Sequence, residues 1–544
     1  MWRPLFLKRA NQPARKGILF VIHRIRSKNP LNPPLEKGDF KAVRPSSRGG
    51  FRTQTRLACF LVYWPILVLP AVLGGARPFL WSFAASVFLG AFALFLLASR
   101  QSLAAIDLKP WLLILLPVLA YPVLQIIPLP LPVISVLSPQ RAVWLQRSFD
   151  ATGDSRWAAS LSYVPLDTLA GGLWILTLVL FALVLHRSIR EGIIRPRRFL
   201  PALFAVAGLE AFYGISQVLV SSTGLGPGAQ CAVGTFANRS HYAAFLGMIW
   251  PLQLVWLLKV SDKDGKTWCG KKRFLRPAFA KQVFYIFLIG LVILGLIFSG
   301  SRGGIIGLAL STAVLIYLGA KSSSLISPFY AGCWVVILIY GWIIGFEGIV
   351  KHFAEIGLDA PSRLKIWQFS WNALRDHWLT GTGVGTYRSV VFAYQVFDTD
   401  LVQVGAAHND YLQVASEWGL PFSLFIFFLV WGYWWITAIG VAKTGPAGEG
   451  AGTEEKLVRA GALAGSAAFL AHSWVEFNWQ IPANQLYFTI LLVLMRYKAP
   501  EQRLTRLSTN ADLLSGRGLE NWERPGSGRR LFFRQLHRSQ PIVS

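Results

Sequence analysis

The stretch VFYIFLIGLVILGLIFSGSRGGIIGLALSTAVLIYLGA, residues 283–320, decides the fold class of this chain. It contains two apolar runs, 283–299 and 303–320, separated by a glycine-rich turn that carries one arginine, Arg302. A helix needs roughly 20 apolar residues to cross a bilayer core about 30 Å thick. Each run is close to that length, so the stretch predicts two membrane-spanning helices joined by a tight turn.

The same kind of run recurs along the whole chain. Of the 544 residues, 53% are hydrophobic and 15% are charged, whereas soluble proteins carry about 25% charged residues. The composition therefore predicts an all-α polytopic membrane protein with about twelve transmembrane helices. The expected spans are 57–75, 79–98, 111–128, 169–186, 198–220, 241–259, 283–299, 303–320, 328–346, 420–442, 458–475 and 483–496.

The formal net charge of +28 raises the question of a nucleic-acid partner. The basic residues gather in the N-terminal segment 1–56, in the loops 187–198 and 259–282, and in the tail 497–544. Alternate loops of a twelve-span protein share one side, and Lys and Arg are enriched on the cytoplasmic side. The charge thus predicts both termini in the cytoplasm and attraction to membrane lipids, and no nucleic-acid partner.

This topology divides the chain into a basic cytoplasmic segment 1–56, a transmembrane domain 57–496 and a basic cytoplasmic tail 497–544. It places loops 129–168, 221–240 and 347–419 on the outer side. The longest of these, 347–419, is aromatic and amphipathic, and long structured loops are usually functional. We expect it to carry short helices that lie over the membrane domain.

Because Lys and Arg are enriched in cytoplasmic loops, arginines on the outer side are unusual, and they are candidate functional residues. Arg302 is flanked by Gly300, Gly303 and Gly304, which would let a bound group approach closely. Arg363, in PSRLKIWQFSWNAL, is expected on an interfacial amphipathic helix, with Arg388 further along the loop. Each arginine also has a purely structural interpretation. Arg302 could extend to lipid headgroups, and Arg363 could lie on a solvated polar face of its helix.

His408 is expected to open a helix that runs into the span near residue 420. A lone histidine at a membrane interface is most often a hydrogen-bonded polar residue, but its imidazole can accept a proton near neutral pH. The segment GTGVG, 381–385, lacks the strand and acid of a dinucleotide site, so it predicts turns. Asp398 and Asp400 form a DxD pattern, the spacing that nucleotide-sugar enzymes use for a divalent metal. Because nucleotide sugars are cytoplasmic and this loop is expected outside, the pattern predicts a solvated turn, with a metal held by the carboxylates as the alternative. Four isolated cysteines predict no disulfide and no metal site.

Four segments, taken together, resemble the O-antigen ligase/polymerase superfamily of bacterial envelope glycosyltransferases. They cover roughly 160–490 and depart mildly at Glu476, where Asp is expected. The segments are GTFANRSHYAAFL (234–246), SRGG (301–304), HNDYLQVASEWGL (408–420) and HSWVEFNWQIPAN (472–484).

The resemblance implies a GT-C-like membrane fold and a metal-independent, inverting enzyme of lipopolysaccharide biosynthesis in the bacterial inner membrane, without a cofactor. Its periplasmic site would move a glycan from undecaprenyl pyrophosphate to a hydroxyl of lipid A-core or of another glycan or protein. Arg302 and Arg363 would hold the pyrophosphate, and His408 would activate the acceptor. Weaker substrate-binding candidates are Arg388, Asn238, His241, Asn409, Glu417, His472 and Asn484.

Other functions stay open at this point. Within the same class, the chain could be an O-antigen or exopolysaccharide polymerase, or a protein O-oligosaccharyltransferase. A polysaccharide transporter or flippase would need charged or broken helices at mid-membrane. Ionisable residues inside the predicted spans are few, and Glu210 is the clearest. The sequence therefore favours a reaction at the outer ends of the helices over transport of a substrate across the membrane. A non-catalytic assembly scaffold is a further alternative.

Overall fold

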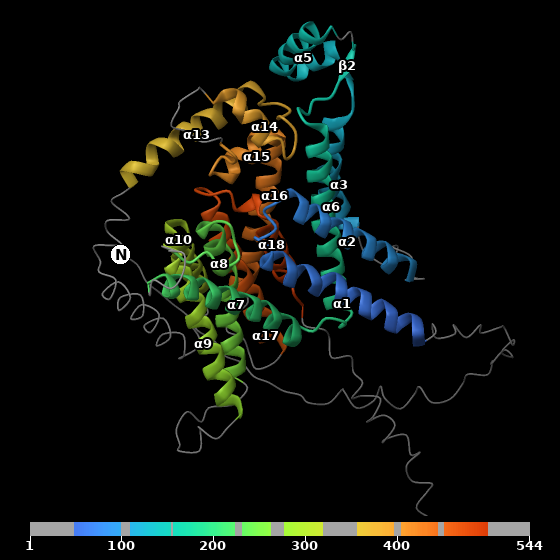
Figure 1. Cartoon of the computed structure of the whole chain (residues 1–544). Helices are drawn as coiled ribbons and strands as arrows, with labels where there is room; N and C mark the ends of the chain where they lie inside the picture. Colours follow the sequence, from blue (N-terminus) through green and yellow to red (C-terminus); the bar gives the residue numbers. More distant parts are fainter. Residues whose placement is uncertain are drawn as a thin grey trace, which may run out of the picture. The chain divides into compact units, whose positions relative to one another are not determined.

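The computed structural model describes residues 48–98, 109–153, 156–222, 231–262, 277–318, 356–395, 404–443 and 451–498. Almost all of the regular structure in these ranges is helical (Figure 1). The elements are α1 (Arg48–Ala71), α2 (Pro78–Ala98), α3 (Lys109–Ile126), β1 (Leu129–Pro130), α4 (Leu131–Leu137), α5 (Pro139–Thr152), β2 (Ala158–Ala159), α6 (Pro165–Arg190), α7 (Pro196–Ser222), α8 (Arg239–Asp262), α9 (Pro277–Phe298), α10 (Arg302–Tyr317), α13 (Ile356–Asp376), α14 (Tyr387–Val391), η4 (Phe392–Tyr394), α15 (Asp410–Trp418), α16 (Leu420–Lys443), α17 (Ala451–His472), η5 (Asn478–Gln480) and α18 (Pro482–Leu494).

Seven of the described helices are long and apolar enough to cross a membrane, namely α1, α2, α6, α7, α8, α9 and α16. Shorter apolar helices occupy Leu115–Ile126, Arg302–Tyr317 and Pro482–Leu494. The chain is therefore a polytopic, all-α membrane protein. Each predicted span in the described ranges coincides with a helix. This holds also for the predicted span 458–475, which coincides with α17 although α17 is not among the helices named above. The span 328–346 lies outside the described residues, as do most of 1–56 and 497–544, so the count of twelve stays a prediction.

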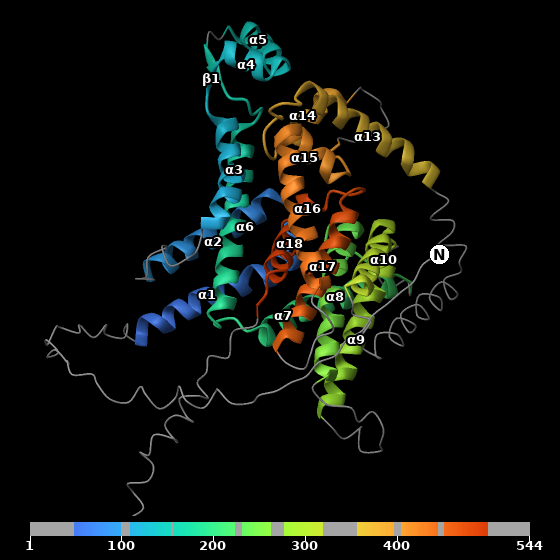
Figure 2. The same ribbon diagram turned by 180° about the vertical axis from the view of Figure 1, so that it is seen from behind.

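The core forms around α8, whose apolar stretch is 94% buried. This helix packs against α7, α9, α10, α17 and α18, and the reverse view shows α16 beside α17 (Figure 2). Small residues make the closest packing possible: a Cβ on Gly465 of α17 would collide with the Met248 carbonyl of α8, and one on Gly461 would meet Leu252. Small residues let helix backbones approach closely in membrane proteins, where packing replaces the hydrophobic drive.

At one end of this bundle, hydrogen bonds connect the loops and the helix ends beside them. We call this end of the bundle the site end, and its loops are residues 72–77, 231–238, 299–301, 404–409 and 473–481. The Ala232 N–H donates to the Phe298 carbonyl at 2.9 Å, and the Ala483 N–H donates to the Gly74 carbonyl at 3.0 Å. At the opposite end, Lys259 forms an ion pair with Glu454. Loops that the sequence assigns to one side thus do contact each other, while which side is cytoplasmic stays a prediction.

Two short structured regions connect the helices. Residues 129–161 form a two-stranded antiparallel pairing, Leu129 opposite Ala159, with α4 and α5 packed on a small apolar core. In its described part the loop 347–419 carries the short helices α14, η4 and α15, as expected, and also α13, which is longer than expected at 21 residues. The GTGVG segment forms turns as predicted, and its three glycines all have positive φ.

One helix prediction is wrong. No helix starts at His408; α15 begins at Asp410, because Asn409 caps it with its side chain. Nor does it run on into the span, because Gly419 takes a φ of +75° that ends α15 before α16 begins at Leu420. With its ψ of 151°, Gly419 has an extended backbone of positive φ that glycine adopts far more readily than other residues, and the helix cannot continue through it.

Candidate functional site

The SRGG turn begins α10 and is closed by its own serine. The Oγ of Ser301 accepts a hydrogen bond from the Gly304 N–H at 3.2 Å and donates one to the Oγ of Ser240 at 3.4 Å. The same hydroxyl lies 3.4 Å from Nε2 of His472. A Cβ on Gly303 would come within 2.5 Å of that nitrogen, so glycine is needed for the imidazole to lie here. The turn thus joins the starts of α8 and α10 to the end of α17.

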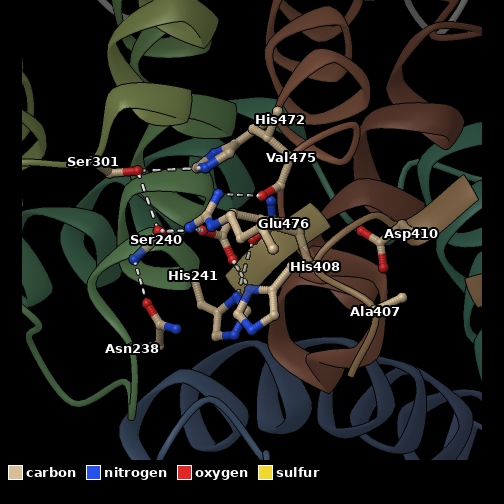
Figure 3. Close-up of polar contacts among 12 residues, drawn as sticks. Asn238, Ser240, His241, Ser301, Ala407, His408, Asp410, His472, Val475 and Glu476 are labelled. Carbon is tan, nitrogen blue, oxygen red and sulfur yellow. Dashed lines mark hydrogen bonds and ion pairs between the residues drawn. The ribbon is translucent and has the colours of Figure 1, made fainter. Parts of the chain in front are cut away.

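The carboxylate of Glu476 is the centre of the polar network at the site end (Figure 3). Nη2 of Arg363 donates to its Oε1 at 2.8 Å, while Nη1 donates to the Val475 carbonyl at 3.1 Å. The Oγ of Ser240 donates to the same Oε1 at 3.1 Å. The other oxygen, Oε2, lies 3.1 Å from Nδ1 of His408. One carboxylate therefore connects α13, the start of α8 and the residues before α15.

The charges around Glu476 keep it ionised, although it is only 4% exposed. Burial by itself would raise the pKa of this carboxyl. The hydrogen bond from His408 and the positive charge of Arg363 outweigh burial and hold the pKa at about 2, below the ordinary 4.5. A carboxylate only accepts hydrogen bonds. Nδ1 of His408 must therefore carry the proton in this contact, which leaves Nε2 as the nitrogen that can accept one.

An aromatic ring also helps to hold His408. Its imidazole meets the ring of Phe477 edge to face, with 4.8 Å between the centroids, and Phe477 also meets His241 at 4.4 Å. The backbone of His408 has a φ of +48°, a left-handed conformation that few non-glycine residues adopt. The contact with Glu476 and this backbone conformation together fix the direction of the side chain.

Asp410 fixes the loop that carries Glu476. Its backbone N–H donates to the Ser473 carbonyl at 2.9 Å, and its Oδ2 accepts from the Trp479 N–H at 2.9 Å. Burial raises the pKa of the Asp410 carboxyl well above its ordinary value, against the lowering effect of the bond from Trp479. Both ends of the segment 473–479 are thus tied to the first turn of α15, two residues after His408.

Four of the weaker substrate-binding candidates lie at the same helix ends. Nδ1 of His241 is 3.0 Å from Oδ1 of Asn478, and Nδ2 of Asn484 donates to the His241 carbonyl at 3.2 Å. Oδ1 of Asn238 accepts from the Ser240 N–H at 2.8 Å. His472, the fourth, contacts Ser301 as described above. The network joins residues that are more than 200 positions apart in the sequence.

The other three candidates lie in different surroundings. Asn409 caps α15, where its side chain accepts the backbone N–H three residues on, at 3.1 Å. The carboxylate of Glu417 accepts the N–H groups of Gly385, at 2.9 Å, and Tyr387, at 3.2 Å, and so anchors the GTGVG turns. Arg388 is exposed on α14. Of the three main candidates, Arg363 and His408 share Glu476, while Arg302, half-buried, begins α10 directly after Ser301.

Glu476 itself has no role in the sequence-based expectations, and neither do Ser240 and Asn478. One signal could have found the glutamate. It stands four residues after His472 at the end of a predicted span, and a buried charge at such a position needs a partner. The distance along the chain from Glu476 to Arg363 conceals which partner it has.

Within the described ranges, no group of three or more His, Cys, Asp or Glu side chains could hold a metal ion. Asp398 and Asp400, the DxD pair, lie outside the described residues. The chemistry that the described site offers is that of an imidazole, a guanidinium and an ionised carboxylate in mutual contact.

Comparison with known proteins agrees with the resemblance over the two segments SRGG (301–304) and HNDYLQVASEWGL (408–420), which lie in the matched range. Residues 287–428 match the family model described as O-antigen ligase. The matched range contains Arg302, Arg363 and His408, and it ends before Glu476. No curated protein matches the chain significantly. The matched segment of this membrane protein is therefore similar to O-antigen ligases, in line with the resemblance that the sequence carries.

Proposed function

We propose that the protein is a membrane glycosyltransferase of the O-antigen ligase type. It moves a glycan from undecaprenyl pyrophosphate to an acceptor hydroxyl, such as one on lipid A-core. The observation that carries the proposal is the shared carboxylate of Glu476, which holds Arg363 on one oxygen and His408 on the other. This arrangement puts a candidate base beside a candidate phosphate ligand, within a segment match to the O-antigen ligase family.

His408 is the proposed general base. With Nδ1–H directed at Glu476, its Nε2 can accept the proton of the acceptor hydroxyl. The oxygen of that hydroxyl attacks the anomeric carbon, the bond from that carbon to the diphosphate oxygen breaks, and undecaprenyl pyrophosphate leaves. A single displacement of this kind inverts the anomeric configuration. Glu476 acts as a positioning residue, because it orients the imidazole and sets its tautomer.

Arg363 and Arg302 are the proposed ligands of the diphosphate. The guanidinium of Arg363 has five N–H groups, and its bonds to Glu476 and Val475 use two of them, so others can bind phosphate oxygens. Arg302 lies in the first turn of α10, where the positive end of the helix dipole adds to its charge. Charge that develops on the leaving diphosphate is stabilised by these groups, and we propose that no metal ion is needed.

The proposal extends to the setting of the enzyme. We infer twelve spans in a GT-C-like fold, a bacterial inner-membrane location, cytoplasmic termini and a periplasmic site. The supporting argument is the alternation of Lys and Arg along the loops. The contacts among the loops of the site end support the grouping of those loops on one side.

The test is transfer by the purified full-length protein in lipid nanodiscs, with an undecaprenyl-pyrophosphate-linked glycan as donor. His408→Asn is the sharpest variant, because asparagine tolerates a positive φ and cannot act as the base. It should reduce transfer about 10²- to 10⁴-fold while donor binding stays intact. Arg363→Lys keeps the charge but loses the planar fork, so it should weaken donor binding as well.

The control is Arg147→Lys, which changes an exposed arginine on α5 in the same chemical way. Normal transfer by His408→Asn would exclude the proposed base. A panel of acceptors separates ligase from related activities: lipid A-core for a ligase, a second repeat unit for a polymerase and a protein for an O-oligosaccharyltransferase. Movement of donor across the bilayer without transfer would instead indicate a flippase.

A further inference from the structure

One face of α13 exposes a line of large apolar side chains. Leu364 is 60% exposed, Trp371 is 59% exposed, and Trp378, just beyond the helix end, is 54% exposed. Leu364 and Trp371 are seven residues, two helical turns, apart and so lie nearly in line along α13, while Trp378 follows in the turn after the helix. Leu374, one turn after Trp371, is buried, as is Phe369. We call Leu364, Trp371 and Trp378 the apolar stripe.

Cationic side chains border the apolar stripe. Lys365 and Arg375 are both exposed on α13, and Arg375 also bonds to its neighbour Asp376 at 3.2 Å. An apolar line with lysine and arginine beside it is typical of helices that lie in the boundary between headgroups and acyl chains. Anionic phospholipid headgroups complement the positive charge.

The end of the apolar stripe is fixed at the start of a membrane span. The carbonyl of Trp378 accepts the N–H of Leu420, the first residue of α16, at 2.6 Å. Tyr121 stacks on Phe422 with 4.0 Å between centroids, and Trp418 joins this stack. Aromatic residues at the ends of spans mark the membrane–water boundary. Both views show α13 at the same end of the bundle as α14 and α15 (Figures 1 and 2).

We propose that α13 lies in the bilayer interface at the site end, with the apolar stripe against phospholipid and its cations on anionic headgroups. The same helix carries Arg363, directly before Leu364, and Arg363 bonds to Glu476. The bilayer therefore sets the position of Arg363 in the site; this role of the bilayer rests on the proposed function. Phospholipid in contact with α13 would then help to hold the site in its geometry, in addition to surrounding the protein.

The test measures the depth of α13 without using activity. The full-length protein, with its native cysteines replaced by serine, carries one fluorescent label at Trp371→Cys in nanodiscs of phosphatidylglycerol and phosphatidylcholine. A quencher attached to the acyl chains should quench this label, and aqueous iodide should not. The control is Ser148→Cys, at an exposed position on α5, where the two quenchers should have the opposite effects.

Three outcomes would overturn the proposal. Equal quenching by iodide at both positions means that the apolar stripe faces water. Protection from both quenchers, together with crosslinking between protomers, means that a second copy covers it. Protection from iodide that appears only on addition of donor glycan means that the face binds sugar.

A second pair of variants tests the coupling to Arg363. With the label moved to Leu364→Cys, Trp371→Ser should lower the equilibrium constant that favours the bilayer-bound position of α13 over the water-exposed one about tenfold, since a large apolar side chain is removed from the interface. Transfer should fall with it, and Trp371→Phe should restore both the depth and the rate. If the label shows the predicted depth and no variant of the chain transfers glycan, the interfacial helix stands and the proposed function fails.

Discussion

Replacing Glu476 by glutamine removes one negative charge from the centre of the site and leaves the size of the side chain nearly unchanged. The carboxylate is deeply buried, and it is the shared partner of Arg363 and His408. Glutamine can accept one of these two hydrogen bonds with its oxygen, but its NH₂ group faces the other donor. The substitution therefore breaks at least one contact and removes the reason for the His408 tautomer.

The size of the effect follows from the pKa of Glu476. Burial would raise this pKa, yet the bond from His408 and the charge of Arg363 hold it at about 2 instead of 4.5. At about 1.4 kcal/mol for each pKa unit, these partners stabilise the folded protein by roughly 3 kcal/mol at neutral pH. For a pKa that is depressed on folding, this contribution is complete above about pH 5 and is lost as the pH falls toward 2.

Thermal unfolding in detergent, from pH 7 down to pH 3, measures this contribution. Glu476→Gln should be less stable than the wild type at pH 7, and at pH 3 the difference should shrink to about 1.4 kcal/mol. Transfer should fall about 10²- to 10⁴-fold at neutral pH, because an imidazole in the wrong tautomer cannot act as the base. Glu476→Asp keeps the charge, so it should restore part of both effects.

Two results would refute this reasoning. A stability difference that stays the same at every pH means that Glu476 fills space and that its charge contributes nothing. Transfer at the wild-type rate by a folded Glu476→Gln variant means that His408 needs no carboxylate, or that it is not the base.

Further outcomes can be checked in the same preparations. Gly303→Ala should reduce stability by about 1–3 kcal/mol, since its methyl group would overlap the His472 imidazole; unchanged thermal unfolding would show that the helices move apart without strain. A cysteine placed at position 398 should react with an impermeant reagent from the periplasmic side and one at 271 should not; the reverse pattern would invert the topology. Chelation by EDTA should leave transfer intact, whereas loss of activity that magnesium or manganese restores would point to Asp398 and Asp400.

The helical architecture was predictable because each span is a local property of the sequence. Apolar length alone locates α9 and α10 on either side of Arg302, and in the structure α9 ends at Phe298 and α10 begins at Arg302. The break between α15 and α16 was missed, although Gly419 followed by Leu420 and Pro421 carries the signal of a helix stop. Apolar periodicity runs through this break and conceals it.

The site was predictable only in part, because its contacts are long-range. Arg302, Arg363 and His408 stand out as polar residues at predicted outer helix ends. The carboxylate that joins two of them is 113 positions from Arg363 and 68 from His408. Periodicity and composition give no information on which loops meet, so Glu476 could be placed only by the fold.

The left-handed backbone of His408 has a consequence for attempts to engineer this enzyme. A non-glycine residue in that conformation carries strain of about 1–2 kcal/mol, which the surrounding contacts must hold in place. Glycine would remove the strain together with the imidazole. The same substitution would also remove the bond to the buried carboxylate of Glu476, so the contact that holds the strained backbone is the one that the proposed chemistry needs. Any search for a sturdier variant should keep this position fixed and seek its gains elsewhere in the helical bundle.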